Sequence, residues 1–120
     1  MDEKDNKIAF FSTISPGDTA RIDTMIGYAM AGIAMDYEVV IFLALDSALV
    51  AKKMIFEKFD VKIKDRIKNS IKEGVKVGIC SASAKTFGIE ETDLIEGTEI
   101  EGIATFYQYA QNAKIVLSWS

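Results

Sequence analysis

Short, continuous runs of apolar residues alternate along this chain with segments whose apolar residues recur at helical spacing. A continuous apolar run is typical of a strand that is buried on both faces of a parallel sheet. Because parallel strands need a crossover connection, a helix is expected between each strand and the next. The alternation therefore predicts an α/β fold, a three-layer α/β/α sandwich with a mostly parallel five-stranded sheet.

Five segments have the strand pattern. The segment 37–45 (YEVVIFLAL) is the most apolar part of the chain, so we expect it at the centre of the sheet. The expected strands are residues 8–14, 37–45, 75–79, 97–103 and 114–119.

The helical pattern is clearest over residues 19–35, where Asp18 or Thr19 can cap the first turn. Its predicted buried stripe consists of Ile22, Met25, Ile26, Ala29 and Ile33. Glycines in this helix, Gly27 and Gly32, predict close packing against the sheet or another subunit. The other expected helices are 46–54 (capped by Asp46 or Ser47), 64–73 (ended by Gly74), 81–87 (ended by Gly88) and 104–112.

Composition limits the classes of protein that fit. With 120 residues, of which 49% are hydrophobic and 27% charged, we expect one globular domain over 1–120, with 1–6 as a flexible tail. The formal net charge of -4 argues against direct binding of nucleic acid. Its apolar stretches are short and interrupted by charges, which predicts no membrane span, no signal peptide and a cytoplasmic location.

Cys80 is the only cysteine, and it lies where the expected strand 75–79 meets the expected helix 81–87. The N–H groups at a helix N-terminus can lower a cysteine pKa from about 8.5 to roughly 3.5–7.5. The amides of Ser81 and Ala82 are the candidate donors to the sulfur. Alternatively, Cys80 is a small buried hydrophobic residue without chemical function.

The chain contains no histidine and no second cysteine. A Cys–His nucleophile pair, an internal dithiol cycle, a disulfide and a thiolate zinc site are therefore excluded. We predict no metal and no cofactor. If Cys80 reacts, the group that it takes up must be removed by a thiol on another molecule. This behaviour is typical of a carrier protein rather than of a self-contained redox enzyme.

Three weaker signals surround this thiol. Lys85 could add a positive charge near Cys80 or be simply solvated, and Asp46 could line the site or cap its own helix. The segment 86–113 holds six acidic residues and no Lys or Arg. Such a segment is a solvated surface or steers a basic partner protein.

Residues 77–89 (VGICSASAKTFGI) and 39–53 (VVIFLALDSALVAKK) resemble the DsrE/DsrF-like family, which includes a subunit of the bacterial tRNA-thiolation relay. The first segment is similar to the family's strand, cysteine, alanine-rich turn and glycine. The second is similar to its apolar strand ending in Asp-Gly, with Ser47 where glycine is common. Residues 102–119 match the family's last helix and strand in length.

The resemblance implies a sulfur carrier or sulfurtransferase that holds sulfane sulfur on Cys80 as a persulfide or thiosulfonate. A helix N-terminus suits such an anion. The implied partners are sulfur-carrier or sulfur-acceptor proteins, and the implied assembly is a homo-oligomer (dimer, trimer or hexamer) or a hetero-oligomer with paralogues. The alternative is a non-catalytic α/β module that binds a small anion or a partner, with Cys80 incidental.

Overall fold

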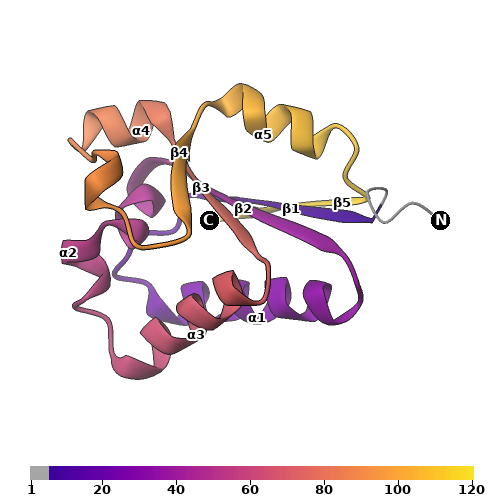
Figure 1. Ribbon diagram of the computed structural model, residues 1–120, viewed down its shortest axis with the longest axis horizontal. Helices are drawn as coiled ribbons and strands as arrows, with labels where there is room; N and C mark the ends of the chain where they lie inside the picture. The colour runs from indigo at the N-terminus through magenta and orange to yellow at the C-terminus, as the bar shows by residue number, and fades with distance from the viewer. Residues whose placement is uncertain (1–5) are drawn as a thin grey trace.

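The computed structural model describes residues 6–120 and contains a five-stranded sheet in which each strand runs parallel to its neighbours (Figure 1). The strand order is β4-β3-β2-β1-β5, so β2 occupies the predicted central position. The predicted α/β fold is confirmed, with a sheet that is entirely rather than mostly parallel within these residues. The strands are β1 (Lys7–Ser12), β2 (Glu38–Leu43), β3 (Lys76–Cys80), β4 (Thr98–Glu101) and β5 (Ile115–Trp119).

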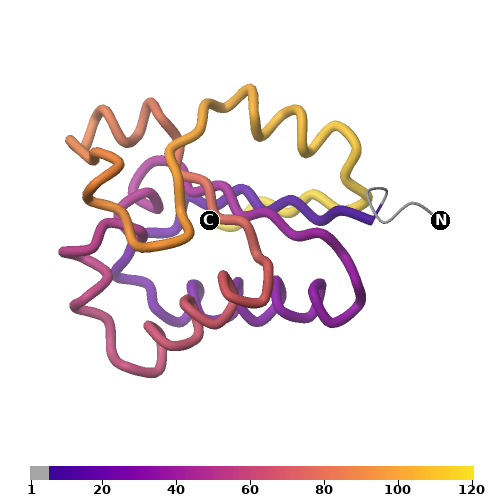
Figure 2. Tube along the Cα trace, in the orientation of Figure 1, coloured from indigo at the N-terminus to yellow at the C-terminus, as the bar shows by residue number. Residues whose placement is uncertain are grey.

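Helices cover both faces of the sheet (Figures 1 and 2). On one face, α1 (Thr19–Ala34) and α3 (Val61–Lys72) enclose the larger hydrophobic core, and on the other α5 (Ile103–Ala110) lies over a smaller cluster. The short helix α4 (Ser81–Thr86) lies on the same side as α5, but its buried Ala84 belongs to the larger core (Figure 1). Short helical segments complete the connections: η2 (Leu45–Ala51), α2 (Lys53–Phe56) and η3 (Glu91–Asp93). None of the helices within residues 6–120 is long and apolar enough to cross a membrane.

The tail expected at 1–6 falls mostly on residues 1–5, which lie outside the described residues. Asn6 is described, and its carbonyl accepts the N–H of Glu38 at 2.7 Å. The chain is thus hydrogen-bonded to β2 one residue before β1 begins.

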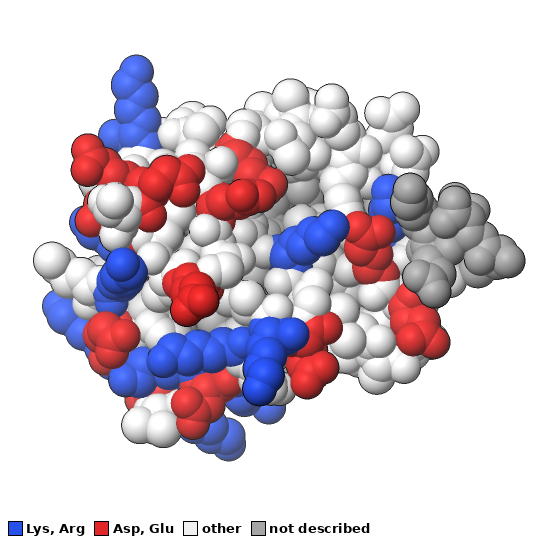
Figure 3. All heavy atoms as spheres, in the orientation of Figure 1, with Lys and Arg blue, Asp and Glu red and all other residues white. Residues whose placement is uncertain are grey.

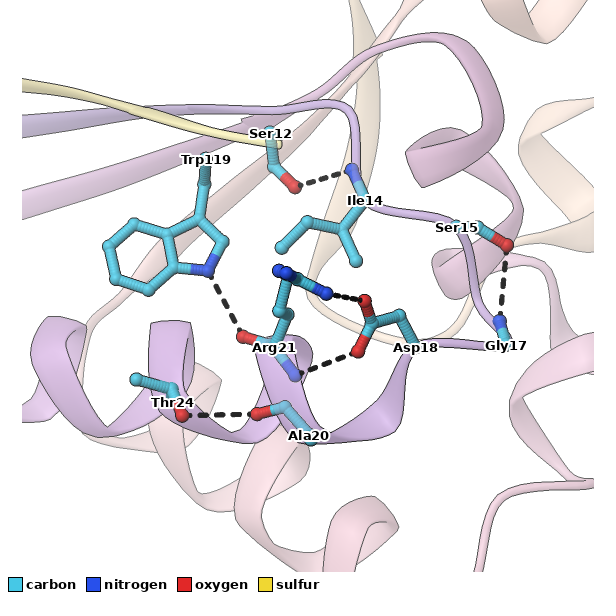
Figure 4. Close-up of polar contacts among 9 residues, drawn as sticks. All are labelled: Ser12, Ile14, Ser15, Gly17, Asp18, Ala20, Arg21, Thr24 and Trp119. Carbon is cyan, nitrogen blue, oxygen red and sulfur yellow. Dashed lines mark hydrogen bonds and ion pairs between the residues drawn. The ribbon is translucent and has the colours of Figure 1, made fainter.

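The first helix follows its sequence pattern closely. Asp18 is the N-cap, and its carboxylate accepts the N–H of Arg21 at 3.2 Å and pairs with the guanidinium of the same residue (Figure 4). The Trp119 indole N–H donates to the Arg21 carbonyl at 3.1 Å and so ties the end of β5 to α1. Gly32 is buried against Ile8 of the sheet, whereas Ile33, predicted in the buried stripe, is only half-buried.

The segment after β2 differs from its prediction. The predicted capping by Asp46 or Ser47 is wrong, because η2 begins after Ala44 without a side-chain cap. The Ser47 hydroxyl instead bonds the buried Ser12 hydroxyl at 2.8 Å. The single predicted helix is also replaced by the 3₁₀ segment η2 followed by the short α2.

The third helix starts earlier than predicted, at Val61 rather than at residue 64. Asp60 is its N-cap and accepts the N–H of Ile63 at 3.0 Å. This bond satisfies an N–H group that the helix cannot pair internally, which fixes the start of α3.

Candidate functional site

Cys80 is the last residue of β3 and the N-cap of α4. Its partly exposed side chain lies on the α5 face of the sheet, packed against the small cluster that contains Phe42 and Phe106. The sequence predicted this position, at the carboxyl end of a strand and the start of a helix. Ligands of open parallel sheets bind beyond the carboxyl ends of the strands, and Cys80 lies at this edge of the sheet.

Polar groups of α4 set the acidity of the thiol. Burial raises the pKa of Cys80, but the Ser83 hydroxyl, the Ser83 amide and the Ala82 amide together lower it by more, so the pKa lies below its ordinary value. A helix of six residues has a small dipole, and the Cys80 side chain forms no cap hydrogen bond of full geometry. The lowering therefore comes from these three nearby groups, which act on the sulfur as local dipoles.

The Ala82 amide, one of the predicted donors, is among the groups that lower the pKa of Cys80, and so is Ser83, which was not among the predicted donors. In a helix, the N–H groups of the second and third residues point back toward the N-cap side chain. Ser81, the first residue, is exposed, and its hydroxyl lies beside Gly102 at the start of α5. Counting three residues from the N-cap would have found Ser83.

Lys85 and Asp46 are both exposed. Lys85 lies in the last turn of α4, and Asp46 lies in the first turn of η2. In the part of the chain that the structure describes, neither side chain forms an ion pair. Their proposed parts at the site stay predictions.

Glu101 pairs directly with Cys80 across the neighbouring strands β4 and β3. Its carboxylate lies over Gly78, where a side chain would collide with it. Burial, and next the nearby Glu99, raise the pKa of Glu101, and Lys76 offsets part of this effect. From the sequence, Glu101 is only one member of an acidic segment, because the strand register alone shows that it adjoins Cys80.

A hollow of about 910 Å³ lies on the same face, where β3 and β4 meet α5. Its lining includes Glu99, Glu101, Phe106 and Tyr109, but not Cys80 itself. The buried Tyr109 hydroxyl has no hydrogen-bond partner among the described residues, and burial raises its pKa. Acidic side chains gather over β4 and the segment before it (Figure 3), so the surface beside Cys80 is negatively charged.

The raised pKa of Glu101 makes a testable prediction. A carboxyl with a raised folded pKa contributes stability that is present below its unfolded pKa of about 4.3 and lost as pH rises through the folded value. We therefore expect Glu101→Gln to increase the free energy of unfolding at pH 7, by less than about 1 kcal/mol because Glu101 is only partly buried and water screens its charge.

Urea denaturation at about pH 3.5 and about pH 7 would measure this effect. The two proteins should differ only at the higher pH, because both side chains are uncharged at the lower one. Glu96→Gln, at an exposed position before β4, is the control for the removal of one charge. An equal effect of Glu101→Gln at both pH values would contradict the prediction.

The fold and the site together define a small parallel α/β protein with a single thiol at a strand-to-helix junction. Polar groups of the following helix lower the pKa of this thiol. Within residues 6–120, no group of three or more His, Cys, Asp or Glu side chains could hold a metal ion.

The chain belongs to the DsrE/DsrF-like family, whose model matches residues 6–119. This match confirms the resemblance seen around Cys80. No curated protein sequence matches the chain.

Three solved structures share the fold. The YchN protein from E. coli has a TM-score of 0.75 and 19% identity over 94% of this chain and 98% of its own. MTH1491 from Methanobacterium thermoautotrophicum, a protein of unknown function, has a TM-score of 0.72 and 17% identity over 94% of this chain and 98% of its own. BT1422 from Bacteroides thetaiotaomicron, also of unknown function, has a TM-score of 0.70 and 18% identity over 98% of both chains. At these identities the likeness shows the fold alone.

Proposed function

We propose that this protein is a sulfur carrier that takes sulfane sulfur onto Cys80 and passes it to a thiol of a partner protein. The observation that carries the proposal is the partly exposed Cys80 thiol, whose pKa is lowered by Ser83 and Ala82. Membership of the DsrE/DsrF-like family supports sulfur as the group that is carried.

Loading begins with the Cys80 thiolate. Its sulfur attacks the outer sulfur of a donor persulfide, the donor S–S bond breaks, and the donor leaves as a thiolate while Cys80 becomes a persulfide. With tetrathionate, attack on an inner sulfur releases thiosulfate and leaves a thiosulfonate on Cys80. Ser83 and the Ala82 amide, which favour the thiolate, also favour the anion that Cys80 then carries.

Unloading requires a second protein, because the chain has no other cysteine. A thiolate of the acceptor attacks the outer sulfur of the Cys80 persulfide, the S–S bond breaks, and Cys80 returns to the thiolate. The acceptor leaves with the persulfide. This cycle needs partner thiols in reduced form, which is the condition of the cytoplasm, where we place the protein.

The surface supports protein partners of two kinds. The acidic residues between α4 and α5 suit an acceptor protein with a basic surface. Exposed apolar side chains, Tyr107 on α5 (64%) and Val116 on β5 (53%), support assembly with further copies of this chain or with paralogues.

Lys85, in the last turn of α4, would add a positive charge near the sulfur anion that Cys80 carries.

Intact-mass measurement after incubation with polysulfide or tetrathionate tests the proposal. The protein should gain a sulfur adduct that a reductant removes, and Cys80→Ser should gain none because it lacks the attacking sulfur. Alkylation with iodoacetamide, run in parallel, shows whether the Cys80 thiol is accessible.

Two results would contradict the proposal. One is an accessible thiol that takes up no sulfur, which would favour a non-catalytic binding module with Cys80 incidental. The other is an equal adduct on Cys80→Ser, which would place the sulfur elsewhere.

A further inference from the structure

One buried hydroxyl joins the start of α4 to the segment that follows β2. Ser83, the third residue of α4, is 6% exposed, and its Oγ accepts the backbone N–H of Leu45 at 2.7 Å. Leu45 has a φ of 53°, a left-handed conformation that a leucine seldom adopts. In this conformation the Leu45 N–H points at Ser83, and the hydrogen bond between them holds the Ser83 oxygen in place.

The Ser83 hydroxyl still has a proton to donate. Within the described residues, the Ser83 hydroxyl forms one hydrogen bond, to Leu45. In this bond the Leu45 N–H is the donor and the Ser83 oxygen is the acceptor. In a helix, the backbone N–H of the third residue points toward the side chain of the N-cap residue, which here is Cys80, so Ser83 and Cys80 are neighbours. An N–H bonded to a hydroxyl oxygen also makes that hydroxyl a stronger donor.

We propose that Ser83 is a positioning residue: its hydroxyl, held by the Leu45 N–H, donates to the Cys80 sulfur and orients it for attack on the sulfur donor. The part that concerns the donor rests on the function proposed above. The direction of the pKa change at Cys80 agrees with this role, because a hydrogen bond to the thiolate lowers the pKa. Ser83 itself forms no bond to the transferred sulfur.

The rate of alkylation of Cys80 by iodoacetamide, followed from about pH 5 to about pH 10, tests this role because the thiolate is the species that reacts. Ser83→Ala should react about ten-fold more slowly at pH 7, the loss typical of one hydrogen bond to an anion, with its midpoint at higher pH. Ser83→Thr, which keeps the hydroxyl, should restore the original profile. Ser81→Ala, at the exposed position two residues earlier, is the matched control and should leave the profile unchanged.

Circular dichroism would establish that each variant is folded. A folded Ser83→Ala whose profile coincides with that of the unmodified protein would overturn the proposal. So would a shift of equal size in Ser81→Ala, because the effect would then not belong to Ser83.

A measurement on the unmodified protein does not depend on the folding of Ser83→Ala. If Ser83 links Leu45 to Cys80, the backbone amide resonance of Leu45 should shift with pH at the midpoint found by alkylation. The shift should be absent in Cys80→Ser. A Leu45 resonance that does not move while the thiol titrates would overturn the proposal.

The intact-mass experiment separates this inference from the proposed function. If the unmodified protein takes up no sulfur but Ser83→Ala still changes the alkylation profile, the sulfur-carrier function is wrong and the role of Ser83 at Cys80 stands. If Ser83→Ala loads sulfur at the original rate with an unchanged profile, the sulfur-carrier function stands and the inference is wrong.

Discussion

Phe42→Ala is expected to lower the free energy of unfolding by about 3–5 kcal/mol, the range for removing a fully buried aromatic ring. Phe42 lies on the central strand β2 and is 1% exposed. Its ring is 5.8 Å from that of Phe11 and 5.2 Å from that of Phe106, measured between centroids. The substitution therefore leaves a cavity and also removes one of the two aromatic contacts that join the sheet to Phe106 of α5, the other being that of Phe11.

Urea denaturation measures this loss, and amide hydrogen exchange shows where it acts. Exchange should accelerate most in α5, because Phe106 is the buried residue of this helix and loses its partner in β2. Gln108→Ala is the matched control, since Gln108 is on the same helix but exposed, and it should change the stability by no more than about 0.5 kcal/mol. Equal losses in the two variants would contradict the prediction.

The sheet could be predicted from the sequence because it depends on patterns that are local. The runs at 8–14 and 37–45 contain too many apolar residues for any strand with a solvated face, so both had to be interior. The structure places them side by side as β1 and β2, in the middle of the sheet. The position of Cys80 followed for the same reason, since the end of an apolar run and the start of a helical pattern lie together in the chain.

The surroundings of Cys80 depend on distant parts of the chain and could not be predicted in the same way. Ser83 obtains its orientation from Leu45, 38 residues earlier, whose left-handed conformation has no sequence signal. Glu101 adjoins Cys80 only through the register between β3 and β4. Ser47 was predicted to cap a helix, but its hydroxyl pairs with that of Ser12, which became a neighbour only when the sheet formed.

The stability of the protein should be as sensitive to substitution in the connection that leads into β4 as it is to substitution in the core. Gly97→Ala is expected to lower the free energy of unfolding by about 3 kcal/mol. Gly97 has a φ of 87°, which costs an alanine roughly 1–2 kcal/mol. A Cβ here would also collide with Cγ2 of Ile71 on α3, and such overpacking adds roughly 1–3 kcal/mol.

Gly88→Ala separates the two contributions. Gly88 also has a positive φ, 65°, but a Cβ there would meet no atom within 4 Å. We expect it to cost only the conformational part, about 1 kcal/mol. Urea denaturation of both variants would measure the difference, and equal costs would contradict a steric contribution at Gly97.

The collision at Gly97 can also be tested through its partner. Ile71→Ala removes the methyl group that the new Cβ would strike, so the double variant should be more stable than the sum of the single losses predicts, by about 1 kcal/mol or more. Strictly additive losses would show that the two side chains do not collide. Because Gly97 immediately precedes β4, which carries Glu101 beside Cys80, this contact between α3 and the start of β4 also helps to hold one wall of the candidate site in register.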